Sequence, residues 1–406
     1  MKATHDWLKI GIFNFLLVSI LGVLMRYKIG FEFPYFDQKQ LLHAHSHFAF
    51  AGWVSHLLYV LLFGFLYEWA ADSAVEYKKY HRLIWANLIC SYGMLLFFAL
   101  QGYGIISIAF STASVVVAYW FAFQYWRDLS RCSRPHPSIA WFRAALLFAV
   151  LSSIGTFVLA YMMATKHVVQ NLYLASVYFY LHFQYSGWFF FAIMGLFISK
   201  LAILPSFRYD KKLFAYFFIA CFPAYLLSIL WLQLPWWLYG LVIAAALLQF
   251  AGLYKLAVLL RANLPIIREQ WNGTAVFILG LSLLALIIKL CLQGGSTIPE
   301  ISRLAFGFRS IVIAYLHLVL LAFTSLFLIG FLFLQKLIPD TALAKTAMLL
   351  LAVGVFLNEF VLMMQGIVSF SYIIIPYLNE VLFGISLLLC MSIFLLLIAV
   401  TGGVRR

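Results

Sequence analysis

Long apolar runs separated by short polar connectors fill the whole chain. Most of these runs reach the ~18 consecutive apolar residues by which a membrane-spanning helix is recognised. Inside a bilayer the backbone polar groups can be satisfied only in helices or closed barrels, and these runs are too long and too unbroken for barrel strands. The pattern therefore predicts an all-α polytopic membrane protein.

We predict twelve spans, four in each third of the chain. They cover residues 8–25, 42–67, 83–100, 104–124, 141–163, 173–198, 214–232, 237–260, 273–292, 306–334, 342–364 and 378–401. With 66% apolar and 10% charged residues, the composition excludes a water-soluble globule. Because the first apolar run lacks a small-residue cleavage site, we expect it to be a span and not a removed signal peptide. All spans are expected to form a single membrane domain, 1–406.

Three histidines stand at equal intervals of 135 residues, at His47, His182 and His317. The seven residues that begin at each histidine read HFAFAGW, HFQYSGW and HLVLLAF. The third copy aligns at its histidine but lacks the Phe, Gly and Trp that the first two copies share. Such a period predicts three four-helix pseudo-repeats around a pseudo-threefold axis, with the histidine on the second helix of each. An alternative is that the copies kept similar residues for packing alone. The repeats would cover residues 1–135, 136–268 and 269–406.

The basic residues predict an orientation. If the twelve spans cross the membrane in alternating directions, seven of the 27 Lys and Arg residues lie on the side of the membrane opposite to the termini. The others lie on the same side as the termini. The seven are Arg26, Lys28, Lys39, Lys166, Lys289, Arg303 and Arg309. The positive-inside rule then places both termini in the cytoplasm of a bacterial cytoplasmic membrane, with the three repeated histidines in its outer half. The net charge of +14 is explained by this membrane topology. The basic residues are scattered over short loops and form no common surface, which argues against nucleic-acid binding.

The stretch LLHAHSHFAFAGWVSH, residues 41–56, carries four histidines. On a helix His43 and His47 share a face, whereas His45 points to the opposite side and His56 returns close to its direction. Ionisable side chains inside a span are costly and are functional candidates by default. We therefore predict haem or metal ligation by His43, His45 and His47. A hydrogen-bonded packing role is the alternative, above all for His56.

Neutral imidazole is the usual ligand of haem iron, and bis-histidine haem needs two rings from different helices. The repeat offers His182 and His317 as the counterparts of His45 and His47. Five cysteines without a C-x-x-C motif argue against a thiolate cluster.

Other residues could serve the same haem. Tyr180 and Tyr315 stand two positions before a repeated histidine and are candidates to hydrogen-bond a ligand or a propionate. Propionates are anionic, so cations near the outer surface could bind them, and the best placed are Lys289, Arg303 and Arg309. The alternative is that these cations merely flank the ninth and tenth spans.

This organisation resembles subunit I of the haem–copper oxidase superfamily, with C-family oxidases and nitric oxide reductases as the nearest members. Twelve helices in three arcs with histidines on helices 2, 6 and 10 carry the resemblance, together with HAHSHFAFAGW and YLHFQYSGWFFFAIMG. In that family an H-x-H motif serves two haem sites. The resemblance implies one or two haems, of b type, and an oxidoreductase of the terminal oxidase or nitric oxide reductase kind.

The chain departs from the family in its metal centre. The family binds copper through histidines on helices 6 and 7, but the seventh span here, LFAYFFIACFPAYLLSILWLQL, has none. The H-x-H motif lies on the second span instead of the tenth. His43 could be an additional ligand of copper or non-haem iron. Nitric oxide reductases use a glutamate beside their non-haem iron, and Glu359 next to Asn358 could play that role, or could be a hydrogen-bonded buried carboxyl.

The sequence thus predicts a haem-binding membrane protein that receives electrons from an outer-side donor, such as a cytochrome subunit, and passes them to a haem open to O₂ or NO. Two other classes stay open. A haem sensor or assembly factor would need one ligated haem and no proton path. A metal or haem transporter would use the same histidines as transient sites, but transporters commonly show two inverted halves and broken helices.

Overall fold

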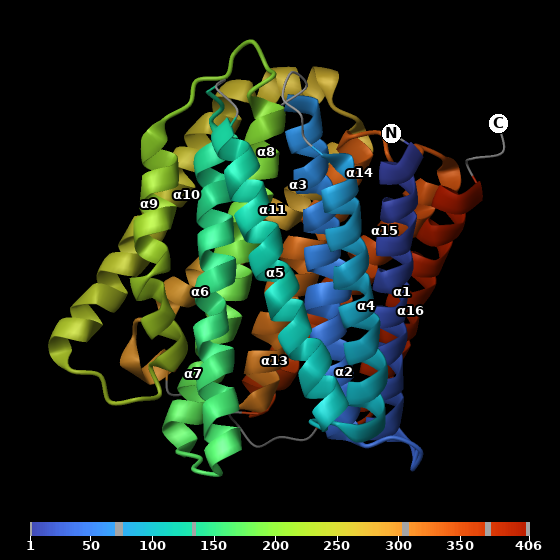
Figure 1. Ribbon diagram of the computed structural model, residues 1–406, viewed down its shortest axis with the longest axis vertical. Coiled ribbons are helices and arrows are strands. Elements are labelled where there is room, and N and C mark those ends of the chain that lie inside the picture. Colours follow the sequence, from blue (N-terminus) through green and yellow to red (C-terminus); the bar gives the residue numbers. More distant parts are fainter. Residues whose placement is uncertain (1, 70–75, 132–134, 303–307, 370–374, 403–406) are drawn as a thin grey trace. The chain divides into compact units, whose positions relative to one another are not determined.

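The computed structural model describes residues 2–69, 76–131, 135–302, 308–369 and 375–402, and this part of the chain is helical without any strand (Figure 1). The elements are α1 (Lys2–Gly30), α2 (Gln38–Phe48), η1 (Ala49–Ser55), α3 (His56–Trp69), α4 (Tyr77–Gln101), α5 (Ile105–Arg131), α6 (Ser138–Thr165), α7 (Gln170–His182), η2 (Phe183–Phe189), α8 (Phe190–Leu201), α9 (Lys211–Cys221), η3 (Pro223–Ile229), α10 (Trp236–Gln270), α11 (Gly273–Gly295), α13 (Arg309–His317), η4 (Leu318–Ser325), α14 (Leu326–Leu334), α15 (Ala342–Ser369) and α16 (Leu378–Gly402).

The spans confirm the predicted class, an all-α polytopic membrane protein. In the described residues eleven helices are long and apolar enough to cross a membrane, and a bent pair of helices raises the number to twelve. The bent pair is the seventh predicted span, where α9 and η3 meet at an angle of 43°. The break follows from Pro223, because proline lacks a backbone N–H and its ring clashes with the preceding turn. The predicted span 214–232 therefore corresponds to two short helices that meet at a break.

A π-helical segment follows each of the three repeated histidines. The segment η1 begins two residues after His47, whereas η2 and η4 begin directly after His182 and His317. A π-turn is rare and is frequently found at functional sites. The same rare backbone feature therefore begins within two residues of each repeated histidine, while the arrangement of three repeats around an axis stays a prediction.

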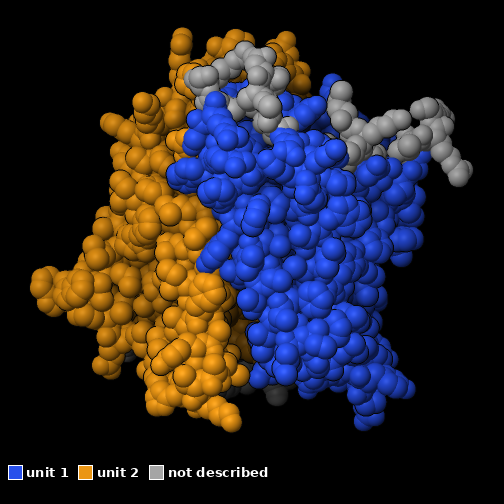
Figure 2. Space-filling model, viewed as in Figure 1, with its two compact units in different colours: residues 1–132, 274–279, 325–406 blue, residues 133–273, 280–324 orange. Residues whose placement is uncertain are grey.

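The chain divides into two compact units, coloured separately in Figure 2. Unit 1 comprises Met1–Cys132, Thr274–Leu279 and Ser325–Arg406, and unit 2 comprises Ser133–Gly273 and Gly280–Thr324. The first boundary lies three residues from the predicted end of the first repeat, but the third predicted repeat is shared between the units.

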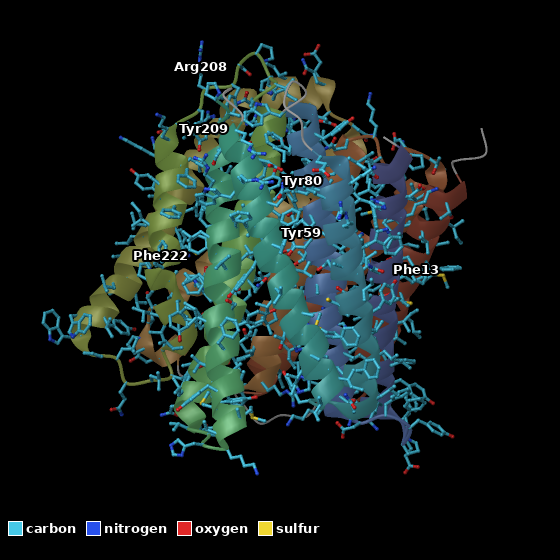
Figure 3. All side chains as sticks on the ribbon, viewed as in Figure 1. Phe13, Tyr59, Tyr80, Arg208, Tyr209 and Phe222 are labelled. Carbon is cyan, nitrogen blue, oxygen red and sulfur yellow. The ribbon has the colours of Figure 1, made fainter. Side chains whose placement is uncertain are left out.

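In unit 1, α1 packs against α16, α2 and η1, and α4 packs against α5 and α2. Trp53 of η1 is buried, stacks on Phe15 at a centroid distance of 4.3 Å and donates a hydrogen bond to Ser325. Near the N-terminal end of α4, Tyr80, which is labelled in Figure 3, donates to the buried carboxylate of Asp128 at 3.0 Å. Aromatic stacking and satisfied polar groups thus hold the histidine-bearing helix in place.

In unit 2, α6 packs against α7, η2 and α8, while η3 packs against α7 and α10. Trp141 of α6 is fully buried and donates its indole N–H to the hydroxyl of Tyr209 at 2.9 Å (Figure 3). Tyr209 lies outside the spans, in the connector before α9, and burial raises the pKa of Tyr209 to about 12. The neutral phenol therefore holds this connector against α6.

Candidate functional site

The histidine-bearing helix α2 presents one face to α4 within unit 1. The ring of His47 stacks flat on Phe98 at 4.3 Å, and the ring of His43 meets Tyr103 edge to face at 4.6 Å. Nε2 of His43 is buried and has no hydrogen-bond partner. The predicted shared face of His43 and His47 is confirmed.

The opposite face of the same helix meets α1. Nδ1 of His45 lies 3.1 Å from the carbonyl oxygen of Val18, and Nε2 of His56 lies 3.0 Å from that of Trp7. We predicted that His45 and His56 point in a similar direction, because eleven residues make about three whole turns of an α-helix. His56 is fully buried and hydrogen-bonded to backbone, which agrees with the packing role.

In unit 2, His182 lies beside the break in the seventh span. It is fully buried, and its Nε2 donates to the carbonyl oxygen of Cys221, the last residue of α9, at 2.9 Å. In a continuous α-helix the Cys221 carbonyl would accept from the N–H of Tyr225, but that N–H donates to the carbonyl of Phe222 instead, so the Cys221 carbonyl is available to His182. Nδ1 of His182 is buried without a hydrogen-bond partner.

A buried lysine accompanies this histidine. Lys289 of α11 is 3% exposed, so the expectation that it would be a surface cation was wrong. It lies well inside its span, six residues before Gly295, and faces the interior of unit 2. Its Nζ donates to Ser186 Oγ at 3.0 Å and lies 5.8 Å from the ring centroids of both Tyr185 and Phe190. Two ring faces and one hydroxyl thus partly compensate the charge.

Hydroxyl groups continue the polar cluster. The hydroxyl of Tyr185 is hydrogen-bonded to the side chains of Ser228 and Tyr315. His317, two residues after Tyr315, has its Nδ1 2.9 Å from the carbonyl oxygen of Ile313 on the same helix. Tyr315 therefore has a protein partner, and its predicted bond to a ligand or propionate stays a prediction.

The other predicted residues each have their own surroundings. Tyr180 lies on α7 where this helix packs closely on α6, because a Cβ atom on Gly155 would come within 2.9 Å of the Tyr180 nitrogen. Arg309 is exposed at the start of α13, and Arg303 lies outside the described residues. Glu359 on α15 accepts a hydrogen bond from Asn358 at 3.1 Å.

No group of three or more His, Cys, Asp or Glu side chains within the described ranges could hold a metal ion. In α2 the reason is geometric, since His43 and His47 face α4 while His45 faces α1. Haem needs only one or two imidazoles, so this finding bears on copper or non-haem iron and not on haem.

Sequence reasoning missed the surroundings of Lys289. The hydroxyl groups of Ser186, Tyr185 and Ser228 and the carbonyl group of Cys221 come from segments far apart in sequence. One signal was present, because a lysine in the apolar run 273–292 is an intramembrane charge and such a charge faces the interior of a bundle by default.

Models of known protein families and curated protein sequences gave no match to this chain.

Proposed function

We propose that this chain is a haem-binding integral membrane protein of the haem–copper oxidase type, with His45 and His317 as candidate iron ligands. The observation that carries the proposal is the hydrogen bond between Nδ1 of each ring and a backbone carbonyl, of Val18 and Ile313 respectively. A carbonyl only accepts, so Nδ1 carries the proton and the lone pair lies on Nε2. Histidines that bind metals almost always have this second bond, because it fixes the tautomer and the ring orientation.

The same reasoning makes His182 a poorer ligand. Its Nε2 donates to Cys221, so its lone pair lies on the buried Nδ1, close to the backbone of its own helix. His47 fits better, because Phe98 covers the face of the ring while a metal would approach its edge. His43, whose Nε2 has no partner, fits in the same way. The residues present therefore fit haem, with His45, His47, His43 and His317 as the imidazoles to test.

Haem, when bound, would supply the redox couple. The residues of this chain would position it and exclude water, with Phe48 and Trp53 fully or almost fully buried around the histidine helix. Electron transfer from a cytochrome-type donor to haem, with O₂ or NO as the gas bound, is the activity that we propose. The proposal includes a bacterial cytoplasmic membrane with both termini in the cytoplasm.

The test is a reduced-minus-oxidised absorption spectrum of the protein purified from cells supplied with haem. We expect a haem band, and a loss of at least half of the bound haem in His45→Ala or His317→Ala. His167→Ala, at an exposed connector position, is the matched control and should retain all of it. A purified protein without haem, or full haem content in both variants, would contradict the proposal.

A metal or haem transporter is the second candidate, favoured by one observation. Broken helices at membrane depth are typical of transporter sites, and the α9–η3 pair is bent beside the buried His182. A transporter would move haem across reconstituted vesicles and would release it during purification. Tight haem that survives purification without vesicle uptake would exclude this candidate.

A further inference from the structure

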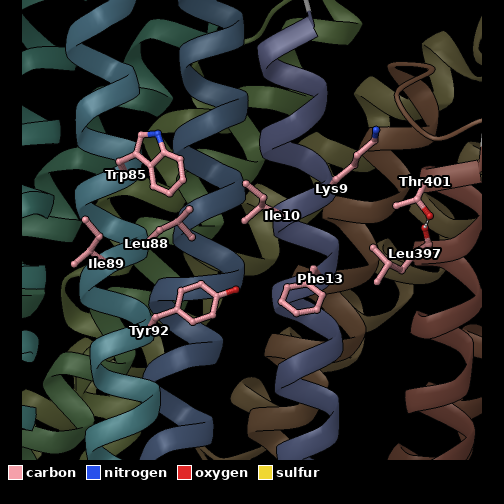
Figure 4. A pocket seen from close by; sticks show the side chains of 9 residues that line it. All are labelled: Lys9, Ile10, Phe13, Trp85, Leu88, Ile89, Tyr92, Leu397 and Thr401. Carbon is pink, nitrogen blue, oxygen red and sulfur yellow. Dashed lines mark hydrogen bonds between the residues drawn. The ribbon is translucent and has the colours of Figure 1, made fainter. Parts of the chain in front are cut away.

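A groove of about 540 Å³ opens on unit 1, between α1, α4 and α16 (Figure 4). Its lining residues are Lys9, Ile10, Phe13, Trp85, Leu88, Ile89, Tyr92, Leu397 and Thr401. The volume falls in the range of small-molecule sites, and all nine residues lie on helices long and apolar enough to cross a membrane.

The groove faces outward and is apolar. Phe13 is 43%, Trp85 47% and Ile89 61% exposed. Tyr92 adds a ring but no available hydroxyl, because its hydroxyl donates to Asn14 at 2.6 Å, and Asn14 in turn donates to the carbonyl oxygen of Gly52 in η1. Because the outer face of spanning helices meets hydrocarbon and not water, an acyl chain is the occupant that suits this lining.

Among the residues that line the groove, Lys9 is a cation, and it belongs to the first part of α1. In Figure 4, Lys9 and Thr401 lie at the upper end, above Phe13 and Tyr92. Lys9 makes no ion pair with any residue that the structure describes. On α4, Arg82 precedes Trp85 by three residues and so lies on the same side of the helix.

We propose that this groove binds one acyl chain of an anionic phospholipid, with the headgroup phosphate held by Lys9 and Arg82. From Trp85 to Tyr92 the groove follows α4 for about 10 Å into the membrane, at 1.5 Å per residue. Bulk lipid is as apolar as the groove, so selectivity must come from the headgroup, and basic side chains near the surface attract anionic headgroups. The bound chain would pack on Tyr92, which the Asn14 bonds connect to the π-helix after His47.

The test uses the fluorescence of Trp85, which lines the groove. The full chain is reconstituted in phosphatidylcholine vesicles that contain brominated phosphatidylglycerol or, at the same fraction, brominated phosphatidylcholine. The Trp85 signal is the difference between the protein and its Trp85→Phe variant. Trp120, 64% exposed on α5, gives the matched control through Trp120→Phe.

We expect phosphatidylglycerol to quench Trp85 more strongly than phosphatidylcholine and to quench Trp120 no more strongly. Lys9→Gln or Arg82→Gln should each lower the preference of Trp85 for phosphatidylglycerol by about fivefold. Equal quenching of Trp85 by both lipids would overturn the site, and a preference that survives both substitutions would overturn the headgroup assignment. Native mass spectrometry of the unsubstituted protein gives a measurement independent of variant folding, and should show retained phosphatidylglycerol in preference to phosphatidylcholine.

Discussion

His47 and His182 occupy the same position of the sequence motif H-F-x-x-x-G-W, and each precedes a π-helical segment. Their surroundings differ. His47 stacks on Phe98, next to a second histidine, whereas His182 is fully buried, donates to a carbonyl at a helix break and lies near a buried lysine. The repeated sequence motif therefore accompanies the same backbone feature, a π-helical segment. The neighbouring helices determine the surroundings of each imidazole, and with them its chemistry.

The largest expected difference between the two copies of the motif concerns their glycines, Gly52 and Gly187, and the effect of replacing them on the free energy of unfolding. A Cβ atom on Gly187 would lie 2.5 Å from Cβ of Phe148, which is fixed to the backbone of α6. A Cβ atom on Gly52 would meet only the ring edge of Phe48, at 2.6 Å, and that ring can turn. We expect Gly187→Ala to lower the free energy of unfolding by about 3 kcal/mol and Gly52→Ala by about 1 kcal/mol. Thermal unfolding in detergent measures both, and equal losses would mean that the two copies pack alike.

The buried lysine makes unit 2 sensitive to the loss of a single hydroxyl. Ser186→Ala removes the hydroxyl that accepts from Lys289, its one acceptor within the described ranges, and should lower the free energy of unfolding by about 2 kcal/mol. Lys289→Met removes the charge while keeping the chain length, so it should be neutral or stabilising by about 1 kcal/mol. In the Lys289→Met background, Ser186→Ala should cost almost nothing. A full loss in that background would show that Ser186 acts without the lysine.

The fold could be predicted well because its signal is local. Each span is an apolar run whose length matches a bilayer, so spans such as 42–67 were found within a few residues of the observed helix, Gln38–Trp69. The break at Pro223 was visible in the sequence as a proline inside an apolar run, and its consequence for the backbone was missed. The faces of His43, His45 and His47 followed from helix periodicity alone.

The partners of these histidines could not be predicted, because they come from other helices. Nothing near His182 in the sequence indicates Cys221, whose carbonyl group fixes its tautomer, and nothing near Ser186 indicates Lys289, 103 residues away. We expected Lys289 near the outer surface although it lies within the predicted span 273–292, because the sequence does not show that Ser186, Tyr185 and Phe190 surround its charge inside unit 2. Side-chain environment depends on which helices meet, and periodicity does not contain that information.

The two imidazoles themselves should differ by a smaller amount. His182→Leu keeps the volume but leaves the Cys221 carbonyl without its donor, which should lower the free energy of unfolding by about 2 kcal/mol. His47→Leu loses a stacked contact with Phe98 and an edge contact with Tyr103, and should cost about 0.5–1 kcal/mol. Chemical or thermal unfolding of the two variants in the same detergent compares them. A larger loss for His47→Leu would indicate that His47 has the more demanding environment.

The smallest expected difference concerns the acidic residues before the third helix of the first two repeats. Glu76 precedes α4 and pairs with Lys79 at 2.6 Å without capping the helix, whereas Asp210 accepts from the backbone of Lys212 and pairs with Lys255 at 2.8 Å. The hydrogen bond from Lys79 lowers the pKa of Glu76, and that from Lys255 lowers the pKa of Asp210.

A lowered pKa in the folded state means that each carboxylate stabilises the protein above its unfolded pKa of about 4, and that this contribution is lost as the pH falls through the lowered value. Asp210→Asn should therefore reduce the melting temperature at neutral pH, with the difference from the unsubstituted protein shrinking as the pH falls below 4. Glu76→Gln should show the same trend with a smaller amplitude, because its side chain does not cap α4. Melting curves between pH 3 and pH 7 measure both. Because asparagine can cap a helix as aspartate does, an Asp210→Asn difference that stays constant over this range would contradict the assignment of its effect to the carboxylate charge.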